Sequence, residues 1–505
     1  MKPAAVCTLL LCVCASVASA RPVHAQCPDG SPPPCGRPTA ARAPAPNSIA
    51  VLYFDNLSRD TADAYLADGL TEEVIVRLQH VPRLDVKTRY DVRRFRGTRI
   101  TDSRSAGRAL GVAYLVTGSV RPSPSRMRVS YELVRTSDGR TLASDIVDTT
   151  AADPWAISNA VALAIAGQVA GRLAPEERAA LTRTPSRDAQ AVDLFRRGKF
   201  LLERAIVCCL SDSPAPYFDR LMSLAFFRAA ITRDSTFADA WAGMADAWIW
   251  IGDIILPNRL AAEQSRAAAR RALALDSTSS RASAALAYAL MMVDYNWSGA
   301  ERLLRRALEL DPRGIEPRLW LAQLLTATGR IDEGWSEVER AWAGDSLNPR
   351  IGFFLFHSLR AARRTDDLSR WASRAPMMAP DLRFFGHLGA RRADSALASA
   401  PASIHRVMAL VASGRLAEAR DSAAALAAAT DAAREGGTTV FINFDDAAIA
   451  WAAVGDLDRA FAALEHSYAV RSGNDFPLLK VSPLFDNLRG DPRYHDLLRR
   501  MHLEP

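Results

Sequence analysis

The residues of this chain that could carry out chemistry are few, and their spacing matches no familiar site. His495 and His502 lie seven residues apart in a predicted helix, where they could share a face with Asp496. Two imidazole nitrogens make a poor metal site, because structural zinc takes four protein ligands and catalytic zinc takes three. We therefore interpret both histidines as surface or packing residues and predict no metal ion and no other cofactor.

Two pairs of adjacent aspartates, 366–367 and 445–446, stand where helices are predicted to begin. A carboxylate at that position ordinarily caps free backbone N–H groups, whereas a catalytic dyad would need its spacing shown in three dimensions. The sequence also lacks the glycine-rich nucleotide loops, the His-Glu-x-x-His helix and the Gly-x-Ser-x-Gly turn. We predict that the chain is not an enzyme. The alternative that stays open is a catalytic site in a cleft between two domains.

Seven cysteines are present, and three of them fall in a predicted signal peptide. Cys27 and Cys35 bracket a short proline-rich loop, so we predict a local disulfide between them in an oxidising compartment. The role of the adjacent Cys208 and Cys209 stays open, since a bond between neighbours is strained and free or buried thiols are the simpler interpretation.

The first twenty residues have the pattern of a secretory signal peptide. Lys2 is followed by an apolar stretch over residues 4–17 and by the small residues 18–20, with a second cleavage choice near residue 25. Proline and small polar residues dominate positions 21–47, which predicts a semi-extended tether. No other window approaches the ~18 apolar residues of a membrane helix. We predict a periplasmic or secreted protein without a stable membrane span.

Length and charge limit the number of domains and the kinds of partner that the chain can have. A chain of 505 residues should divide into at least two domains. The net charge of +7 could suggest a nucleic-acid partner. However, the chain has only four lysines, and its arginines stand beside acidic residues, so no basic stripe forms. We predict no nucleic-acid binding.

Hydrophobic patterns between residues 48 and 175 predict an α/β domain. Apolar runs at 49–54 and 113–120 are typical of buried strands, and residues 127–133 alternate as a strand should. Apolar residues at four-residue steps over 66–78 predict an amphipathic helix. A strand-helix-strand-helix order followed by a meander gives a mixed sheet.

The rest of the chain repeats one short phrase: an alanine-rich amphipathic run, then an acidic or small residue, then Ser or Pro. The phrase closes at Asp234, Asp276, Asp311, Asp345 and Ala379, so that the last three intervals are 35, 34 and 34 residues. A period near 34 residues made of two helices predicts a helical solenoid. We expect about seven helix pairs over residues 190–472, with an irregular stretch at 381–402.

Both parts resemble known families. Residues 48–175 are similar to the TolB amino-terminal-like domain, except that Tyr53 stands where the family usually has proline; the resemblance is carried by Ser48–Leu52, Phe54–Ser58, Tyr65–Glu73 and Leu110–Val120. Residues 190–472 resemble tetratricopeptide repeats, and 473–505 resemble the terminal cap found with them. The resemblance implies an α/β amino-terminal domain with a mixed sheet followed by an all-α tetratricopeptide superhelical solenoid.

A tetratricopeptide solenoid implies a protein-interaction scaffold that binds a peptide or protein on its concave face. By resemblance, the residues on that face are Asp246, Trp250, Tyr288, Met292, Gln323, Phe353, His357 and Arg360. Their mixture of aromatic, apolar and polar side chains suits a peptide or protein segment. Because relatives join these domains to cyclases, kinases or DNA-binding modules, an accessory or sensory subunit of a signalling system is the alternative. The oligomeric state stays open.

Overall fold

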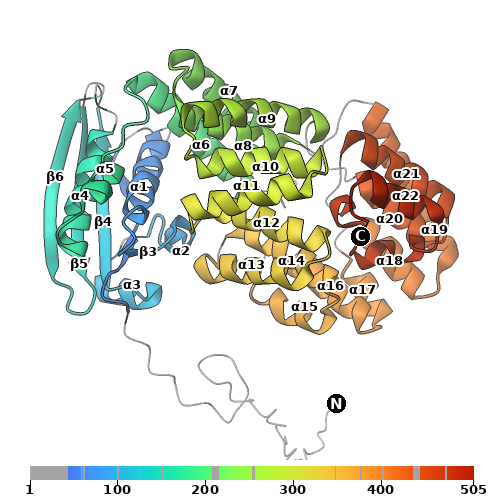
Figure 1. The fold of residues 1–505 in the computed structure, drawn as a ribbon. Helices are drawn as coiled ribbons and strands as arrows, with labels where there is room; N and C mark the ends of the chain where they lie inside the picture. The colour runs from blue at the N-terminus through green and yellow to red at the C-terminus, as the bar shows by residue number, and fades with distance from the viewer. Residues whose placement is uncertain are drawn as a thin grey trace, which may run out of the picture. The chain divides into compact units, whose positions relative to one another are not determined.

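The chain follows the predicted order, with a mixed sheet first and helices after it (Figure 1). The computed structural model describes residues 44–58, 60, 63–98, 100, 102–123, 126–150, 153, 155–207, 215–252, 256, 258–346, 348–375, 378–400, 403–435, 444–471 and 475–504. The predicted signal peptide, nearly all of the predicted tether, and Cys27, Cys35, Cys208 and Cys209 lie outside these residues. Among the described helices, none is both long and apolar enough to cross a membrane.

The amino-terminal sheet is mixed, with neighbouring strands in the order β3-β1-β4-β5-β6 and β2 paired to β4. The first pairings, among β1, β3 and β4, are parallel, and β4, β5 and β6 form an antiparallel meander. The strands are β1 (Ser48–Val51), β2 (Asp55–Asn56), β3 (Asp85–Val86), β4 (Tyr114–Pro122), β5 (Arg126–Arg135) and β6 (Thr141–Thr150). Strand β4 matches the apolar run predicted at 113–120, and β5 matches the alternating run at 127–133.

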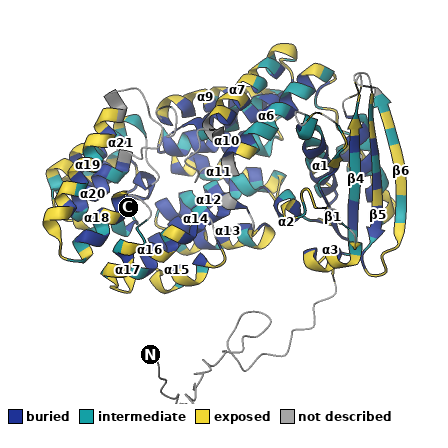
Figure 2. Cartoon of the chain, turned by 180° about the vertical axis from the view of Figure 1, so that it is seen from behind, coloured by how far each residue is buried: buried dark blue, intermediate teal, exposed yellow. Residues whose placement is uncertain are grey.

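Helices α1 and α4 pack together against this sheet. Their apolar residues, such as Val74 and Ile165, meet the strand residues Ile49 and Leu115 in one buried cluster. The helices of this part are α1 (Ala64–Gln79), α2 (Arg89–Arg93), α3 (Ser103–Leu110), α4 (Ala156–Ala170) and α5 (Pro175–Leu181). The edge strand β6 is largely exposed (Figure 2).

After α5 the chain forms consecutive antiparallel helix pairs, each packed on the next. They are α6 (Ala189–Val207) with α7 (Ala215–Arg233), α8 (Ala238–Ile251) with α9 (Asn258–Leu275), α10 (Ser280–Met292) with α11 (Trp297–Leu310), α12 (Ile315–Ala327) with α13 (Ile331–Gly344), α14 (Pro349–Ala361) with α15 (Thr365–Ala372), α16 (Ala379–Gly389) with α17 (Ala393–Ala398), α18 (Ser403–Ala412) with α19 (Leu416–Glu435), and α20 (Phe444–Ala453) with α21 (Leu457–Val470). The stretch expected to be irregular contains the short pair α16 and α17.

Small residues allow the helices of a pair to approach closely. A Cβ atom added at Gly334 would lie 2.8 Å from the carbonyl oxygen of Ala322 on the paired helix. Gly329, in the turn between the same two helices, has a φ of 93°, a conformation that side chains disfavour. These two glycines let α12 and α13 turn sharply and pack closely.

The carboxyl-terminal segments do not continue outward as an open solenoid would. The short 3-10 helices η3 (Phe476–Leu478) and η4 (Pro483–Leu488) and helix α22 (Pro492–Arg500) share one apolar core with α8–α12 and α18–α21. The indole Nε1 of Trp297 donates to the carbonyl of Met501 at 2.8 Å, and Asn258 Nδ2 donates to the carbonyl of Arg471 at 3.0 Å. The chain therefore folds back on its own repeats, whereas a simple solenoid repeat contacts only its neighbours.

Candidate functional site

The residues predicted to line the concave face come from the first helices of four successive pairs, α8, α10, α12 and α14. Four of them are nearly inaccessible: Tyr288, Met292, His357 and Arg360 are 5%, 6%, 9% and 6% exposed. The other four, Asp246, Trp250, Gln323 and Phe353, are half-buried. The sequence places these residues on corresponding helices but gives no sign that the chain itself covers half of them.

Aromatic side chains fill the space between these helices. Trp320 lies 4.7 Å from Tyr288 and 6.4 Å from Trp250, measured between ring centroids. Phe354 meets Trp320 edge to face at 5.2 Å. The Tyr288 hydroxyl donates to Asn258 Oδ1 at 3.0 Å. Most of this aromatic surface is therefore committed to packing between repeats.

The polar residues His357 and Arg360 meet the chain's own carboxyl-terminal part. Arg360 pairs with Asp475, and it also donates to His357 Nδ1 at 2.9 Å. Burial, followed by the charge of Arg360, lowers the pKa of His357 well below its usual value. The backbone N–H groups of Asp475 and Phe476 donate to Asp445 Oδ2 at 2.7 and 2.8 Å. Asp445 thus binds the backbone of this later segment.

The two carboxyl-terminal histidines do not share a helix face. His495 lies on α22 and faces Glu504, whereas His502 follows the helix and its Nδ1 lies 3.3 Å from the carbonyl of Tyr295. Within the described ranges, no group of three or more His, Cys, Asp or Glu side chains is arranged to hold a metal ion.

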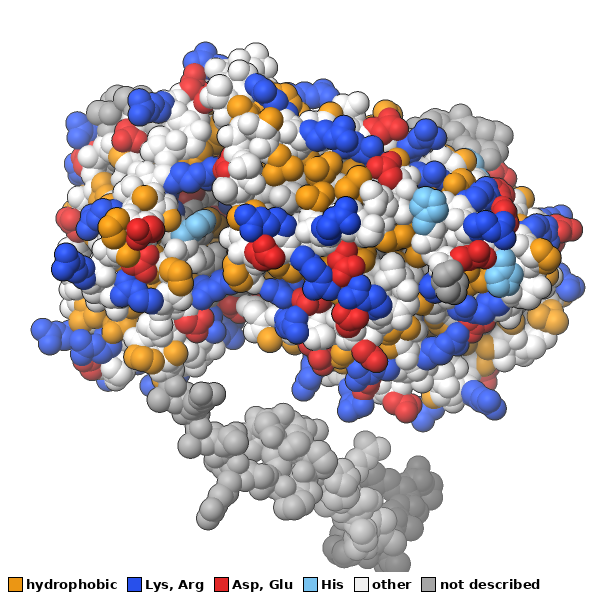
Figure 3. All heavy atoms as spheres, viewed as in Figure 1, with side chains coloured by type: hydrophobic (Ala, Val, Ile, Leu, Met, Phe, Trp, Pro, Cys, Tyr) orange, Lys and Arg blue, Asp and Glu red, His pale blue; other side chains and the backbone are white. Residues whose placement is uncertain are grey.

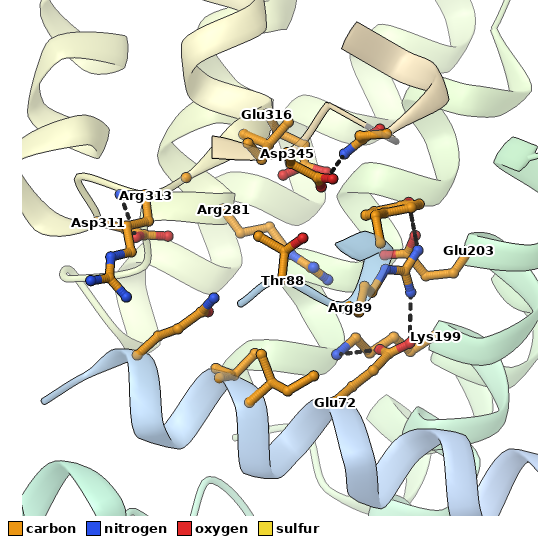
Figure 4. A pocket seen from close by; sticks show the side chains of 17 residues that line it. Glu72, Thr88, Arg89, Lys199, Glu203, Arg281, Asp311, Arg313, Glu316 and Asp345 are labelled. Atoms are coloured by element: carbon orange, nitrogen blue, oxygen red, sulfur yellow. Dashed lines mark hydrogen bonds and ion pairs between the residues drawn. The ribbon is translucent and has the colours of Figure 1, made fainter. Parts of the chain in front are cut away.

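A pocket of about 180 Å³ lies where the α/β domain meets the helix pairs (Figure 4). Its walls come from α1, from residues 88–90 at the start of α2, from α6 and α10, and from the turns before α12 and α14 with the start of α12. The lining residues are Glu72, Ile75, Val76, Gln79, Thr88, Arg89, Tyr90, Lys199, Glu203, Arg281, Asp311, Arg313, Gly314, Ile315, Glu316, Asp345 and Asn348.

Most charges in this pocket neutralise one another. Glu72 lies between Arg89, at 2.6 Å, and Lys199, at 3.0 Å. Glu203 pairs with Arg89 on one side and lies 3.7 Å from Arg350 on the other. Burial alone would raise the pKa of Glu203, but the nearby arginines outweigh it and lower the pKa to about 2. These pairs join α1 and α2 to the helix pairs.

Two charged side chains in the pocket have unused hydrogen-bonding positions. Arg281 Nε pairs with Asp246 at 3.2 Å, while its side chain stays 35% exposed and reaches into the pocket (Figure 4). Asp345 is 1% exposed; its Oδ2 accepts from Asn348 at 3.3 Å, and its Oδ1 has no hydrogen-bond partner among the described residues. Burial, reinforced by Asp91, raises the pKa of Asp345 to about 7.

Sequence analysis left open a site in a cleft between two domains but named none of the residues of this pocket. Its residues come from segments more than two hundred positions apart, and no local motif connects them. The one available signal was the repeated phrase, because Asp311 and Asp345 both close it. On the face shown in Figure 3, basic and acidic side chains are interspersed, as the sequence suggested.

Comparison with known proteins supports the repeats. Residues 294–362, from α11 to α14, match the tetratricopeptide repeat family model, so the chain contains tetratricopeptide repeats. A curated relative, "Putative adenylate cyclase 3" of Rhizobium meliloti (strain 1021), is 32% identical over 168 residues. That match covers 33% of this chain and 28% of the relative, so the chain spans less than a third of the relative's length.

Two solved structures of tetratricopeptide proteins are also similar. One is YrrB, a TPR protein with an unusual peptide-binding site, at 15% identity and a TM-score of 0.23, covering 44% of this chain and 97% of that one. The other is the P58(IPK) TPR domain, at 11% identity and a TM-score of 0.17, covering 60% of this chain and 97% of that one.

Proposed function

We propose that this chain is an exported, non-catalytic interaction scaffold that holds a peptide or protein partner through its tetratricopeptide repeats. The observation that carries the proposal is the run of helix pairs containing the matched repeats at 294–362. Stacked repeats present extended surfaces that suit elongated ligands. The amino-terminal mixed sheet supports a TolB amino-terminal-like domain as the second part, and the apolar stretch at residues 4–17 supports export.

The half-buried residues of the predicted binding face are Asp246, Trp250, Gln323 and Phe353. Asp246 is paired with Arg281, which leaves Trp250, Gln323 and Phe353 as the part open to a partner. Aromatic and amide side chains of this kind can anchor a partner, with one buried ring and one directional hydrogen bond. Tyr288, Met292, His357 and Arg360 serve the chain's own packing in this structure. A partner therefore docks on Trp250, Gln323 and Phe353 and leaves the buried residues in place.

The test is photocrosslinking in the cell envelope. A photoreactive residue at Phe353 is expected to capture one discrete partner, whereas the same residue at Leu416, which is 44% exposed on α19, serves as the control. Phe353→Ala combined with Gln323→Ala should weaken the purified complex by about 1–3 kcal/mol. Equal capture at both positions, or unchanged affinity in the double variant, would contradict the proposed face.

A second candidate is an accessory subunit of a signalling system. It is favoured by an alignment of 168 residues, 32% of them identical, with a relative named as a putative adenylate cyclase. In that case the crosslinked partner should itself be a signalling enzyme whose activity changes on adding the chain. If the activity of that enzyme is unaltered in the reconstituted complex, the accessory-subunit proposal is contradicted and the scaffold proposal is retained.

The pocket gives specific support to a third candidate, an enzyme with its site between the domains. It holds a buried carboxyl group, Asp345, beside the hydroxyl-bearing Thr88 and the cationic Arg281. A carboxyl whose pKa lies near the working pH is suited to general acid-base catalysis. Turnover of ester, peptide or phosphoester probes that disappears in Asp345→Asn would establish this candidate; turnover by neither protein would remove it.

A further inference from the structure

Most of the charged groups that line the junction pocket are paired with oppositely charged neighbours. Arg89 and Lys199 are neutralised by Glu72 and Glu203. Glu316 pairs with Arg350, which lies just behind the lining. The pocket therefore has little attraction left for a simple cation or a simple anion.

Two charged residues in the turn before α12 hydrogen-bond to backbone groups. Arg313 donates from Nη2 to the carbonyl of Leu84 at 2.8 Å, and Asp311 accepts from the backbone of Arg313 at 3.1 Å. These bonds hold the turn against strand β3 of the α/β domain. They occupy one hydrogen-bonding position on each of Arg313 and Asp311, although both side chains keep their charge.

Two groups of opposite sign, Arg281 and Asp345, have hydrogen-bonding positions that no described residue uses. Arg281 uses Nε for Asp246, and the outer nitrogens of its guanidinium make no other hydrogen bond among the described residues. Asp345 is almost fully buried and lines the pocket, and its Oδ1 has no donor, because the neighbouring Thr88 hydroxyl donates to Asp91 Oδ2 instead. An unpartnered buried acceptor is costly, so a ligand that donates to it gains more than the same ligand would in water.

We propose that this pocket binds a small zwitterion, with its carboxylate on Arg281 and its protonated amine on Asp345. A carboxylate matches the planar, multiply donating guanidinium edge, and an ammonium supplies the donor that Asp345 Oδ1 lacks. Ile75, Val76, Tyr90 and Ile315 complete the lining with apolar surface for a side chain or methylene chain. The volume of about 180 Å³ suits an amino acid or a very short peptide.

Such a ligand would touch both parts of the chain. Thr88 and Arg89 belong to the α/β domain, whereas Arg281 and Asp345 belong to the helix pairs. Binding at this junction would stabilise the contact between them in proportion to ligand concentration. This inference is independent of the proposed partner-binding face, because none of its residues belongs to that face except Asp246, which only holds Arg281.

The experiment measures binding of defined probes to the full chain by calorimetry and thermal unfolding. The zwitterions are glycine, β-alanine, 4-aminobutyrate, leucine and glycylglycine, which vary the separation of the two charges and the apolar bulk. Propylamine and propionate each carry one of the two charges. At least one zwitterion should bind at least about tenfold more tightly than either single-charge probe. Failure of every zwitterion, or equal binding of a single-charge probe, would overturn the inference.

Variants locate the site. Arg281→Gln and Asp345→Asn should each weaken the best zwitterion by about tenfold or more, because each removes one of its two charge-assisted hydrogen bonds. Arg318→Gln is the control, since Arg318 likewise forms an ion pair with an acidic residue, Glu337, but lies outside the pocket. Arg281 is half-exposed, so its variant keeps the test decisive if Asp345→Asn does not fold. Wild-type affinity in Arg281→Gln would overturn the assignment.

Discussion

Distant parts of this chain meet in two places whose chemistry differs. At the junction of the α/β domain with the helix pairs, the contacts are ion pairs, such as Arg196 Nε and Nη2 with Glu73 at 2.6 and 2.9 Å. At the carboxyl-terminal closure, where η3, η4 and α22 pack on the earlier repeats, the contacts are mostly apolar and surround one buried ion pair, Arg360 with Asp475. Phe476, Phe485 and Tyr494 there are 2%, 0% and 2% exposed. One interface is polar and surrounds a pocket, and the other is a continuation of the core.

The difference explains which surface is free to bind. Directional ion pairs cannot fill space completely, so the junction keeps a cavity and two groups with unused bonding capacity. Apolar side chains close-pack, so Tyr288 and Met292, which sequence analysis assigned to a partner, are buried in the same core as the closure. The position of a residue on a repeat thus does not decide whether it is accessible.

The largest effect is expected from opening the closure. Phe476→Ala should lower the free energy of unfolding by about 3–5 kcal/mol, because it leaves a cavity in the shared core. Urea unfolding measures this change. Phe218→Ala, at a side chain 64% exposed on α7, is the control and should stay within about 0.5 kcal/mol. Similar changes in both variants would mean that the closure is not part of the core.

The polar centre of the closure gives an effect of comparable size. Arg360→Met should cost about 3–5 kcal/mol, because Asp475 is then buried without its partner. Adding Asp475→Leu should recover most of that loss, since both charges are then gone. Urea unfolding of the two single variants and the double variant forms the cycle. Additive losses would show that the two groups do not interact.

The junction should respond to pH through Asp345. Its pKa rises from 3.8 to about 7 on folding, so the folded state keeps a proton that the unfolded state has lost. The resulting stabilisation is complete below about pH 4 and is lost as pH rises through about 7, a change of up to about 4 kcal/mol. Asp345→Asn should remove this dependence, and urea unfolding across that range measures it. The same slope in wild type and variant would assign the effect to other groups.

The smallest effect is expected at the exposed rim of the junction. Arg183 lies 2.6 Å from Asp276 and 3.4 Å from Asp239, and its side chain is 49% exposed. Arg183→Gln should cost no more than about 1 kcal/mol, and added salt should reduce the difference further. Thermal unfolding at low and high salt gives the comparison. A loss as large as that of Phe476→Ala would erase the distinction between the two interfaces.

Local patterns in the sequence were sufficient to predict most individual elements. The alternating run at 127–133 lies in β5, and the four-residue apolar steps over 66–78 lie in α1. The repeat period predicted the helix pairs, and the family model matches tetratricopeptide repeats at 294–362. These features depend on neighbouring residues, so a periodic pattern is enough to reveal them.

Accessibility and the pocket could not be predicted in the same way. Arg360 follows a repeat pattern that predicts a solvent-facing position, but its partner, Asp475, lies more than a hundred residues later. Glu72, Arg281 and Asp345 have no sequence relation that would place them together. Contacts of this kind depend on the angle between successive helix pairs. Small packing differences at every pair add up to set that angle.

The amino-acid sequence by itself determined the mixed sheet, the helix pairs and the small residues that let those helices pack, because periodicity and residue size act over short distances. Only the tertiary structure decided that the carboxyl-terminal segments return to cover the repeats, and that Arg281 and Asp345 face one pocket. The physical reason is that long-range contacts are selected by the combined burial of many apolar side chains, which no short stretch of sequence contains.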